Sequence, residues 1–131
     1  MALITWTAAQ YGTKVDICDD QHKTLFGLLN DLHDAAGGND RKAIGSKLDA
    51  LIAFVVEHFA TEERLMQAKK YSGYIAHKAE HDKLVETCAD LQKKFHAGQA
   101  EVTQETTAFV KSWLDSHIPK VDMPYEPALN S

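Results

Sequence analysis

Apolar residues recur at steps of three and four along four segments of the chain, a spacing that keeps side chains on one face of an α-helix. The pattern predicts helices over residues 17–36, 41–69, 73–96 and 103–117. The first dozen residues lack this period and are expected to form an extended N-terminal arm. Four such helices joined by short connections favour an all-α fold, an antiparallel up-down-up-down four-helix bundle.

Glycine, proline and capping residues mark the ends of the predicted helices. Gly37 and Gly38 precede Asp40, which can cap the second helix, and Thr103 can cap the fourth. Three prolines are expected to end helical structure near the C-terminus: Pro119, Pro124 and Pro127. A single domain over residues 1–131 is expected, because a chain of this length buries about two-thirds of its unfolded surface.

The four apolar stripes carry polar residues where leucine would be ordinary. The four stripes, one for each predicted helix in chain order, consist of the following residues: Cys18, His22, Leu25, Leu29, Leu32 and Ala36; Ile44, Leu48, Leu51, Val55, His58, Glu62 and Leu65; Tyr74, His77, His81, Leu84, Cys88, Leu91 and Phe95; and Val102, Thr106, Phe109, Trp113 and His117. An unpaired buried imidazole or carboxylate costs on the order of several kcal/mol, comparable with the whole stability of a small domain. Six such side chains on four stripes need a shared partner, and a metal ion can satisfy all of them.

These six side chains are expected to meet at one end of an antiparallel bundle. Those on the first and third predicted helices lie near the helix starts, whereas those on the second and fourth lie near the helix ends. His58 with Glu62, and His77 with His81, are spaced i, i+4. Both members of each pair can therefore face one ion.

Asp122 is a candidate seventh ligand. It lies five residues after His117, so a continuous α-helix would turn it away from the stripe. Pro119 disfavours helix at Ile118, which lets the chain turn and bring Asp122 back over the bundle end. Five imidazoles and two carboxylates exceed the needs of one ion and suit two ions bridged by the carboxylates. Iron, zinc, copper and nickel all accept such ligands.

Composition excludes several other classes of protein. The net charge is −5 with both signs spread along the chain, which argues against the basic stripe of a nucleic-acid binder. The chain contains no apolar run near the ~18 residues of a membrane span, and MALITWT lacks the pattern of a secretory signal. Cys18 and Cys88 are too few for a disulfide framework. We therefore expect a cytoplasmic protein with no nucleic-acid partner, not embedded in a membrane.

Four short motifs carry a family resemblance. They are DDQH at 19–22, HFATEE at 58–63, HKAEH at 77–81 and HIPKVD at 117–122. Together they resemble the hemerythrin family, and most closely its single-domain bacterial members. The match extends from Trp6 to Asp122 and includes all seven ligand positions in order, whereas the proline-broken tail MPYEPALNS departs from the family pattern.

The resemblance implies a non-haem di-iron centre that binds dioxygen reversibly, in an oxygen carrier or store rather than an enzyme. By position, the resemblance assigns three histidines to one iron: His77, His81 and His117. It assigns His22 and His58 to the other iron, and Glu62 and Asp122 as the carboxylates that bridge the two. With an oxo or hydroxo bridge as the third link, the first iron has six ligands and the second has five. The second iron would then keep an open position for dioxygen. A monomer that supplies an oxygen-consuming enzyme is the expected biological setting.

Two other classes of function stay open. A di-iron oxidase, peroxidase or ferroxidase is one, although such centres are typically rich in glutamate with Glu-x-x-His pairs, and the stripes carry no such pair. An oxygen- or iron-sensing binding module is the other, and it requires a partner surface.

The other histidines and acidic residues near the predicted ligands are expected to have structural roles only. His33 and His96 lie one position beyond stripe residues, and Glu57 and Glu63 are expected to be solvated beside the ligand positions. The ligating histidines are expected to donate their second ring nitrogen to partners that the sequence does not name. Residues expected to pack around the site are Leu25, Phe26, Phe59, Trp113, Ile118, Tyr71 and Tyr74.

Overall fold

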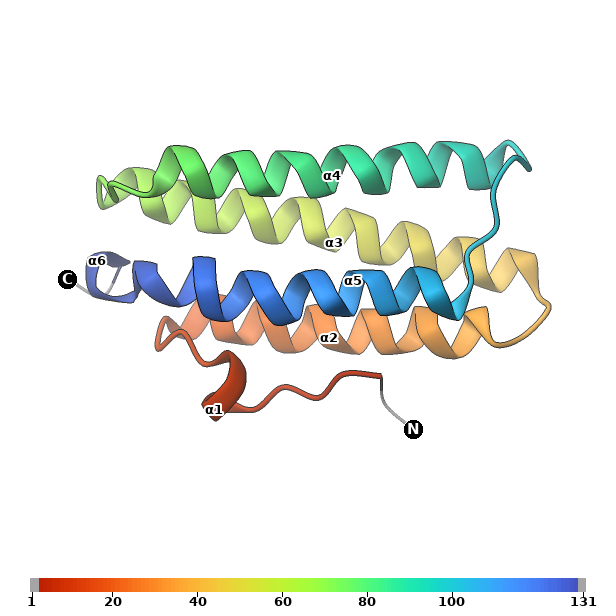
Figure 1. Cartoon of the computed structure of the whole chain (residues 1–131), viewed down its shortest axis with the longest axis horizontal. Coiled ribbons are helices and arrows are strands. Elements are labelled where there is room, and N and C mark those ends of the chain that lie inside the picture. Colours follow the sequence, from red (N-terminus) through yellow and green to blue (C-terminus); the bar gives the residue numbers. More distant parts are fainter. Residues whose placement is uncertain (1–2, 130–131) are drawn as a thin grey trace.

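The computed structural model describes residues 3–129, and its regular elements over that range are all helical. Four long helices run up, down, up and down as an antiparallel bundle (Figure 1): α2 (Asp16–Ala36), α3 (Arg41–Ala68), α4 (Tyr74–His96) and α5 (Gln104–His117). Each bound agrees with the predicted helices to within one residue. The prediction of a four-helix bundle is therefore confirmed.

Capping explains where the helices begin. The Asp40 carboxylate accepts hydrogen bonds from the amides of Lys42 and Ala43, at 3.1 and 3.2 Å, at the start of α3. Thr103 forms a capping box with Thr106 at the start of α5. These side chains satisfy amides that have no partner within the helix.

Arg41 fixes the connection between α4 and α5. Its guanidinium lies over the ring of Phe95, at 3.9 Å from the centroid, and donates to the carbonyl oxygens of Phe95 and Ala100. It also pairs with Glu101 at 2.9 Å. In the same connection Gly98 has a φ of +78°, a conformation that glycine adopts without strain.

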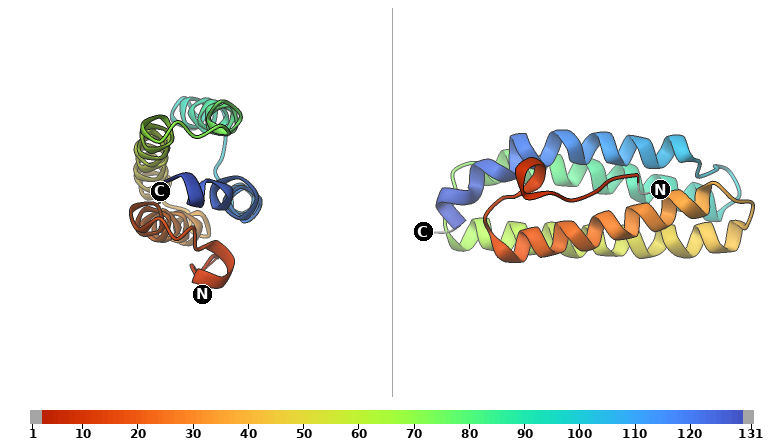
Figure 2. Two further views of the ribbon diagram at one scale, coloured as in Figure 1. Left: turned by 90° about the vertical axis from the view of Figure 1, so that its left-hand side faces the viewer. Right: turned by 90° about the horizontal axis from the view of Figure 1, so that it is seen from below.

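The core lies between the helices and is apolar along most of the bundle. Leu25, Leu29 and Leu32 of α2 pack with residues of α3, including Leu48 and Val55. The end-on view in Figure 2 shows the helices around this core. Among residues 3–129 no helix has the length and apolar character needed to cross a membrane.

The predicted inward stripe of the fourth helix is wrong at Phe109, although Val102 and His117 are buried as predicted. Phe109 is 53% exposed, whereas Thr107 and Leu114 are buried with His117. Phe109–Val110 and Trp113–Leu114 are adjacent apolar pairs, so the sequence offers two registers that both end at His117. The observed one follows Thr107, Val110, Leu114 and His117, and it requires a buried threonine. The Thr107 hydroxyl donates to the Gln104 carbonyl oxygen at 2.9 Å and lies 2.6 Å from Nδ1 of His33.

The N-terminal arm runs along the outside of α2 and α5, as Figure 2 shows, and contains one short helix, α1 (Ala8–Tyr11). The backbone of Ile4 exchanges two hydrogen bonds with the side chain of Asn30, at 3.0 and 2.8 Å. The Tyr11 hydroxyl donates to the carboxylate of Asp115 on α5. The arm is extended as predicted, apart from α1.

The expectation that prolines end helical structure is wrong at the C-terminus. The chain continues from α5 into a π-helical turn, η1 (Ile118–Asp122), a 3₁₀ turn, η2 (Met123–Tyr125), and α6 (Glu126–Leu129). Within η1 the Met123 amide donates to the Ile118 carbonyl oxygen, an i to i+5 bond. Proline lacks the N–H that a continuing α-helix would use, and the wider turn accommodates this loss.

Candidate metal centre

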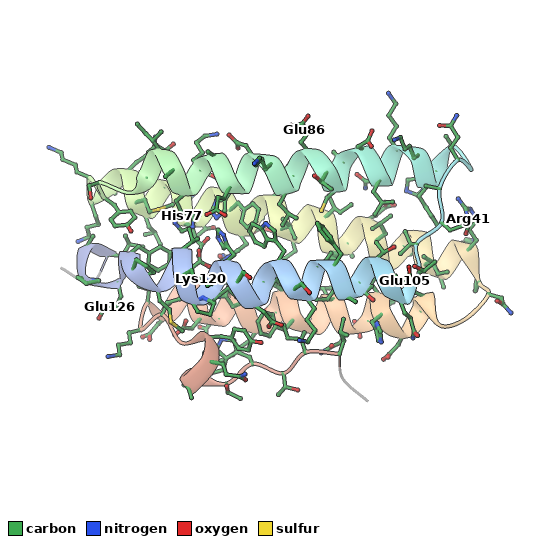
Figure 3. The ribbon with its side chains drawn as sticks, in the orientation of Figure 1. Arg41, His77, Glu86, Glu105, Lys120 and Glu126 are labelled. Carbon is green, nitrogen blue, oxygen red and sulfur yellow. The ribbon has the colours of Figure 1, made fainter. Side chains whose placement is uncertain are left out.

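The seven residues predicted as ligands converge at one end of the bundle, where α2 and α4 begin and α3 and α5 end. Figure 3 shows His77 directed inward at this end, near α6, whereas Arg41 lies at the opposite end. None of the seven side chains is more than 3% exposed: His22, His58, Glu62, His77, His81, His117 and Asp122. The helical spacing read from the sequence therefore does bring them together.

The cluster divides into two groups that share both carboxylates. The three-histidine group contains His77, His81 and His117. The two-histidine group contains His22 and His58. In each group, together with Glu62 and Asp122, the ligand-type atoms lie within 4.8 Å of one another.

Asp122 faces both groups with different oxygens. Its Oδ1 lies 2.7 Å from Nε2 of His77 and 2.8 Å from Nε2 of His117, while its Oδ2 lies 3.1 Å from Nε2 of His22. The two oxygens of Asp122 therefore face different histidine groups.

Glu62 is the second shared carboxylate. Its Oε1 lies 3.3 Å from Nε2 of His81 and 3.4 Å from Nε2 of His58. Its Oε2 lies 3.4 Å from Nε2 of His22. Glu62 thus reaches histidines of both groups from the centre of the cluster.

Most of the inward atoms of the cluster have no hydrogen bond of acceptable geometry, despite these short distances. The buried atoms without one are Nε2 of His22, His77, His81 and His117, Oε1 of Glu62, and both carboxylate oxygens of Asp122. Buried polar atoms are nearly always satisfied in proteins, so a convergent set of orphans calls for a partner. Imidazole nitrogens and carboxylate oxygens are ligands for divalent transition metals, and the residues fit a metal centre.

The charges of the chain itself show how strongly the cluster attracts a cation. Burial alone would lower the pKa of His22, but the adjacent Asp122 and Glu62 raise it to about 10. Burial lowers the pKa of His58 to about 4. Burial raises the pKa of Asp122, yet His117, His22 and His77 outweigh it and hold that pKa well below the usual range. The carboxylates therefore stay ionised and draw positive charge into the cluster.

The backbone path that brings Asp122 to the cluster differs from the prediction. The chain does not leave the helix at Ile118; the η1 turn carries it onward, and its wider winding returns Asp122 to the side of His117. The predicted position was right, and the predicted break was wrong. Single-turn π-helical segments occur frequently at functional sites.

Three residues behind the ligands were missed by sequence reasoning. Nδ1 of His58 lies 2.7 Å from Oε1 of Gln21, and Nδ1 of His81 lies 3.0 Å from Oε2 of Glu63. The Tyr125 hydroxyl donates to Oε2 of Glu62 at 2.7 Å. The expectation that Glu63 is solvated is wrong, because its side chain is only 18% exposed. The rule that ligating histidines use their second nitrogen was the available signal, but it does not say which residue accepts. The rule holds here for His58 and His81, whereas Nδ1 has no hydrogen-bond partner within residues 3–129 in the other three histidines of the cluster: His22, His77 and His117.

Apolar and aromatic residues cover the histidine rings. Phe59 stacks on His81 at 3.7 Å between centroids, and Trp113 stacks on His117 at 4.1 Å. Of the other residues predicted to pack around the site, Leu25, Phe26 and Ile118 are buried in the apolar core. Tyr71 and Tyr74 are partly buried against a second apolar cluster that includes Met66 and Tyr125.

Fold and cluster together define a four-helix-bundle protein with a buried histidine–carboxylate metal centre. Residues 13–129 match the family described as "Hemerythrin HHE cation binding domain", and the chain belongs to this family. The resemblance inferred from the four motifs is thereby confirmed.

Individual relatives agree with this assignment. The chain is 62% identical over 131 residues to a protein named "Bacteriohemerythrin" from Methylococcus capsulatus, and the match covers all of both chains. It is 38% identical over 111 residues to a "Hemerythrin-like protein" from Naegleria gruberi, covering 85% of this chain and 82% of that one. A crystal structure titled as wild-type hemerythrin superposes with a TM-score of 0.99 at 62% identity, covering 99% of this chain and all of that one. The chain is thus similar to single-domain bacterial members of the family.

Proposed function

We propose that this protein binds dioxygen reversibly at a di-iron centre and serves as a cytoplasmic oxygen carrier or store. The observation that supports the proposal is the unequal division of the cluster: two residue groups share Glu62 and Asp122 but contain three and two histidines. A pair of ferrous ions, when bound, supplies the electrons for dioxygen binding. The two groups would hold one ion each.

The protein's part is to hold the two ions differently. His77, His81 and His117 surround one position, whereas only His22 and His58 surround the other. An ion held by His22 and His58 would have one protein ligand fewer than an ion held by His77, His81 and His117, and it could therefore accept an external ligand. The unequal histidine count would thus favour dioxygen binding at the two-histidine position.

The surroundings suit a carrier better than an oxidase. The rings of His81 and His117 are covered by Phe59 and Trp113, and the neighbouring interior is formed by Leu25, Phe26 and Ile118. Apolar walls exclude water, the Tyr125 hydroxyl proton is held by Oε2 of Glu62, and a shortage of free protons disfavours cleavage of the O–O bond. The histidine-rich composition also differs from the glutamate-rich centres typical of di-iron oxidases.

Metal analysis and optical spectra under alternating gases test the proposal. We expect two irons per chain and an absorption band that disappears under argon and returns under oxygen over repeated cycles. His58→Ala removes a ligand of the two-histidine position and is expected to abolish the cycle. The matched control is His96→Ala, because His96 is half exposed and pairs with Asp49 at the other end of the bundle.

Two outcomes would contradict the proposal. Purified protein that holds no iron under iron-replete expression is one of them. The other is a spectrum that changes once and does not return while peroxide or water is released, since that behaviour belongs to an oxidase.

A further inference from the structure

The two histidine groups differ in the charge that lies behind their ligands. In the three-histidine group, Nδ1 of His81 lies 3.0 Å from a carboxylate oxygen of Glu63. In the two-histidine group, Nδ1 of His58 lies 2.7 Å from the amide oxygen of Gln21. An anionic acceptor therefore supports one group and a neutral acceptor supports the other.

Gln21 is fixed in the orientation that this contact needs. Its amide nitrogen donates to the Thr61 hydroxyl at 3.3 Å, and that hydroxyl donates to the backbone oxygen of Glu57 at 3.1 Å. The amide oxygen is thereby left to accept from His58. Gln21 holds the ring of His58 in place but adds no negative charge.

Glu63 does both. A carboxylate that accepts from a ligating imidazole orients the ring and strengthens it as an electron-pair donor, and loss of such a partner typically weakens metal binding about 10–100-fold. The Glu63 side chain is only 18% exposed, so solvent screens its charge incompletely. The three-histidine group gains both a third imidazole and this charge.

Tyr125 acts on the opposite side of the shared carboxylate. Its hydroxyl donates to Oε2 of Glu62 at 2.7 Å, and this oxygen lies 3.4 Å from Nε2 of His22 in the two-histidine group. The Tyr125 ring is fully buried and lies parallel to the ring of His77, at 5.7 Å between centroids. The hydrogen bond withdraws negative charge from the Glu62 oxygen that faces His22 of the two-histidine group.

We propose that the chain binds its two metal ions with unequal strength, and that Glu63 and Tyr125 are the positioning residues that enlarge the difference. The three-histidine position fills first and releases last, and the two-histidine position is the labile one. The inference rests on the proposed function only in requiring two ions. It does not depend on dioxygen, and it therefore also holds for a redox-inactive cation such as Zn²⁺.

Release of Zn²⁺ tests this inference in the full-length protein. The chain is loaded with two equivalents of Zn²⁺ and mixed with a coloured chelator in excess, and release is followed by absorbance. We expect two phases of equal amplitude with rates at least about tenfold apart. His58→Ala should remove the fast phase and keep the slow one, which assigns the phases to the two positions.

Charge variants then test the role of the residues behind the ligands. Glu63→Gln should accelerate the slow phase about 10–100-fold and leave the fast phase unchanged. Gln21→Glu places the same charge behind His58 and should slow the fast phase. Tyr125→Phe should slow the fast phase by a smaller factor. Glu57→Gln is the matched control, because Glu57 is an exposed carboxylate on the same helix, and it should change neither phase.

The outcomes separate this inference from the proposed function. A chain that binds fewer than two ions contradicts the di-iron proposal itself. Two bound ions that leave in a single phase, or a folded Gln21→Glu variant with an unchanged fast phase, overturn the inference alone. Circular dichroism establishes that each variant is folded, and Gln21→Glu still tests the effect of charge if Glu63→Gln proves unstable.

Discussion

The two ends of the bundle are built on opposite principles. The far end, where α3 and α5 begin, is filled by apolar side chains such as Leu32, Ile44, Leu48 and Phe95. The metal end is filled by seven buried ionisable side chains whose inward atoms mostly lack hydrogen bonds. Burial of apolar area stabilises the far end without any ligand, whereas the metal end carries desolvated polar groups that only a cation satisfies. The bundle thus joins an end whose packing needs no ligand to an end whose buried polar groups call for a cation.

Metal removal should have the largest effect on the difference in stability between the two ends. We expect chelation to lower the free energy of unfolding by about 4 kcal/mol for each ion, the stabilisation that a ligand gives at roughly 1,000 times its Kd. Hydrogen exchange should accelerate around His22 and His77 and much less around Leu32 and Leu48. Denaturant unfolding with and without chelator, together with amide exchange, measures both effects. Equal loss of protection at the two ends would contradict the division.

Leu48→Ala probes the far end and should have a smaller effect. Leu48 is 3% exposed, and truncation of a buried leucine costs about 2–5 kcal/mol. The variant should lose this stability while its bound metal, measured by elemental analysis of the folded protein, remains unchanged. A matching loss of metal would show that the two ends are not independent.

The acid dependence of Asp115 gives the smallest effect, and it concerns the last turn of α5, two residues before His117 at the metal end. Burial raises the pKa of Asp115, but hydrogen bonds from Lys111 and Tyr11 outweigh it and lower that pKa below the usual value. The carboxylate therefore stabilises the fold above its unfolded pKa, and this contribution is lost as the pH falls through the lower folded value.

Asp115→Asn should accordingly lower the free energy of unfolding at pH 7 by about 0.5 kcal/mol, because the pair is partly exposed, and the difference from the parent should disappear as the pH falls below the usual range of aspartate. Urea unfolding of both chelated proteins across this range measures it. A difference independent of pH would mean that the carboxylate acts through packing rather than charge.

Much of this fold could be predicted because local signals in the sequence agree with one another. Glycine and capping residues set helix bounds within one residue of those observed, and steps of three and four placed six ligands on the correct faces. The prediction for the fourth helix was wrong at Phe109, where two adjacent apolar pairs leave the register ambiguous. The sequence pattern favours neither register of this helix, and packing against the other helices determines which residues are buried.

The parts of the site that could not be predicted depend on contacts between distant segments. Gln21 meets His58, Glu63 meets His81 and Tyr125 meets Glu62 only after the bundle has closed. Neither hydrophobic period nor residue spacing encodes such contacts. The η1 turn was hidden for a different reason: proline ordinarily signals the end of a helix, and here it lies inside a wider one.

Because α2, α3, α4, α5 and η1 all contribute residues to the cluster, it cannot form in a fragment that lacks any one of these elements. Before the helices dock, only the neighbouring pairs His58–Glu62 and His77–His81 can chelate, and each offers two donors. A metal ion held by all of these groups must therefore enter after the helices have docked, and it cannot serve as the nucleus from which the chain begins to fold.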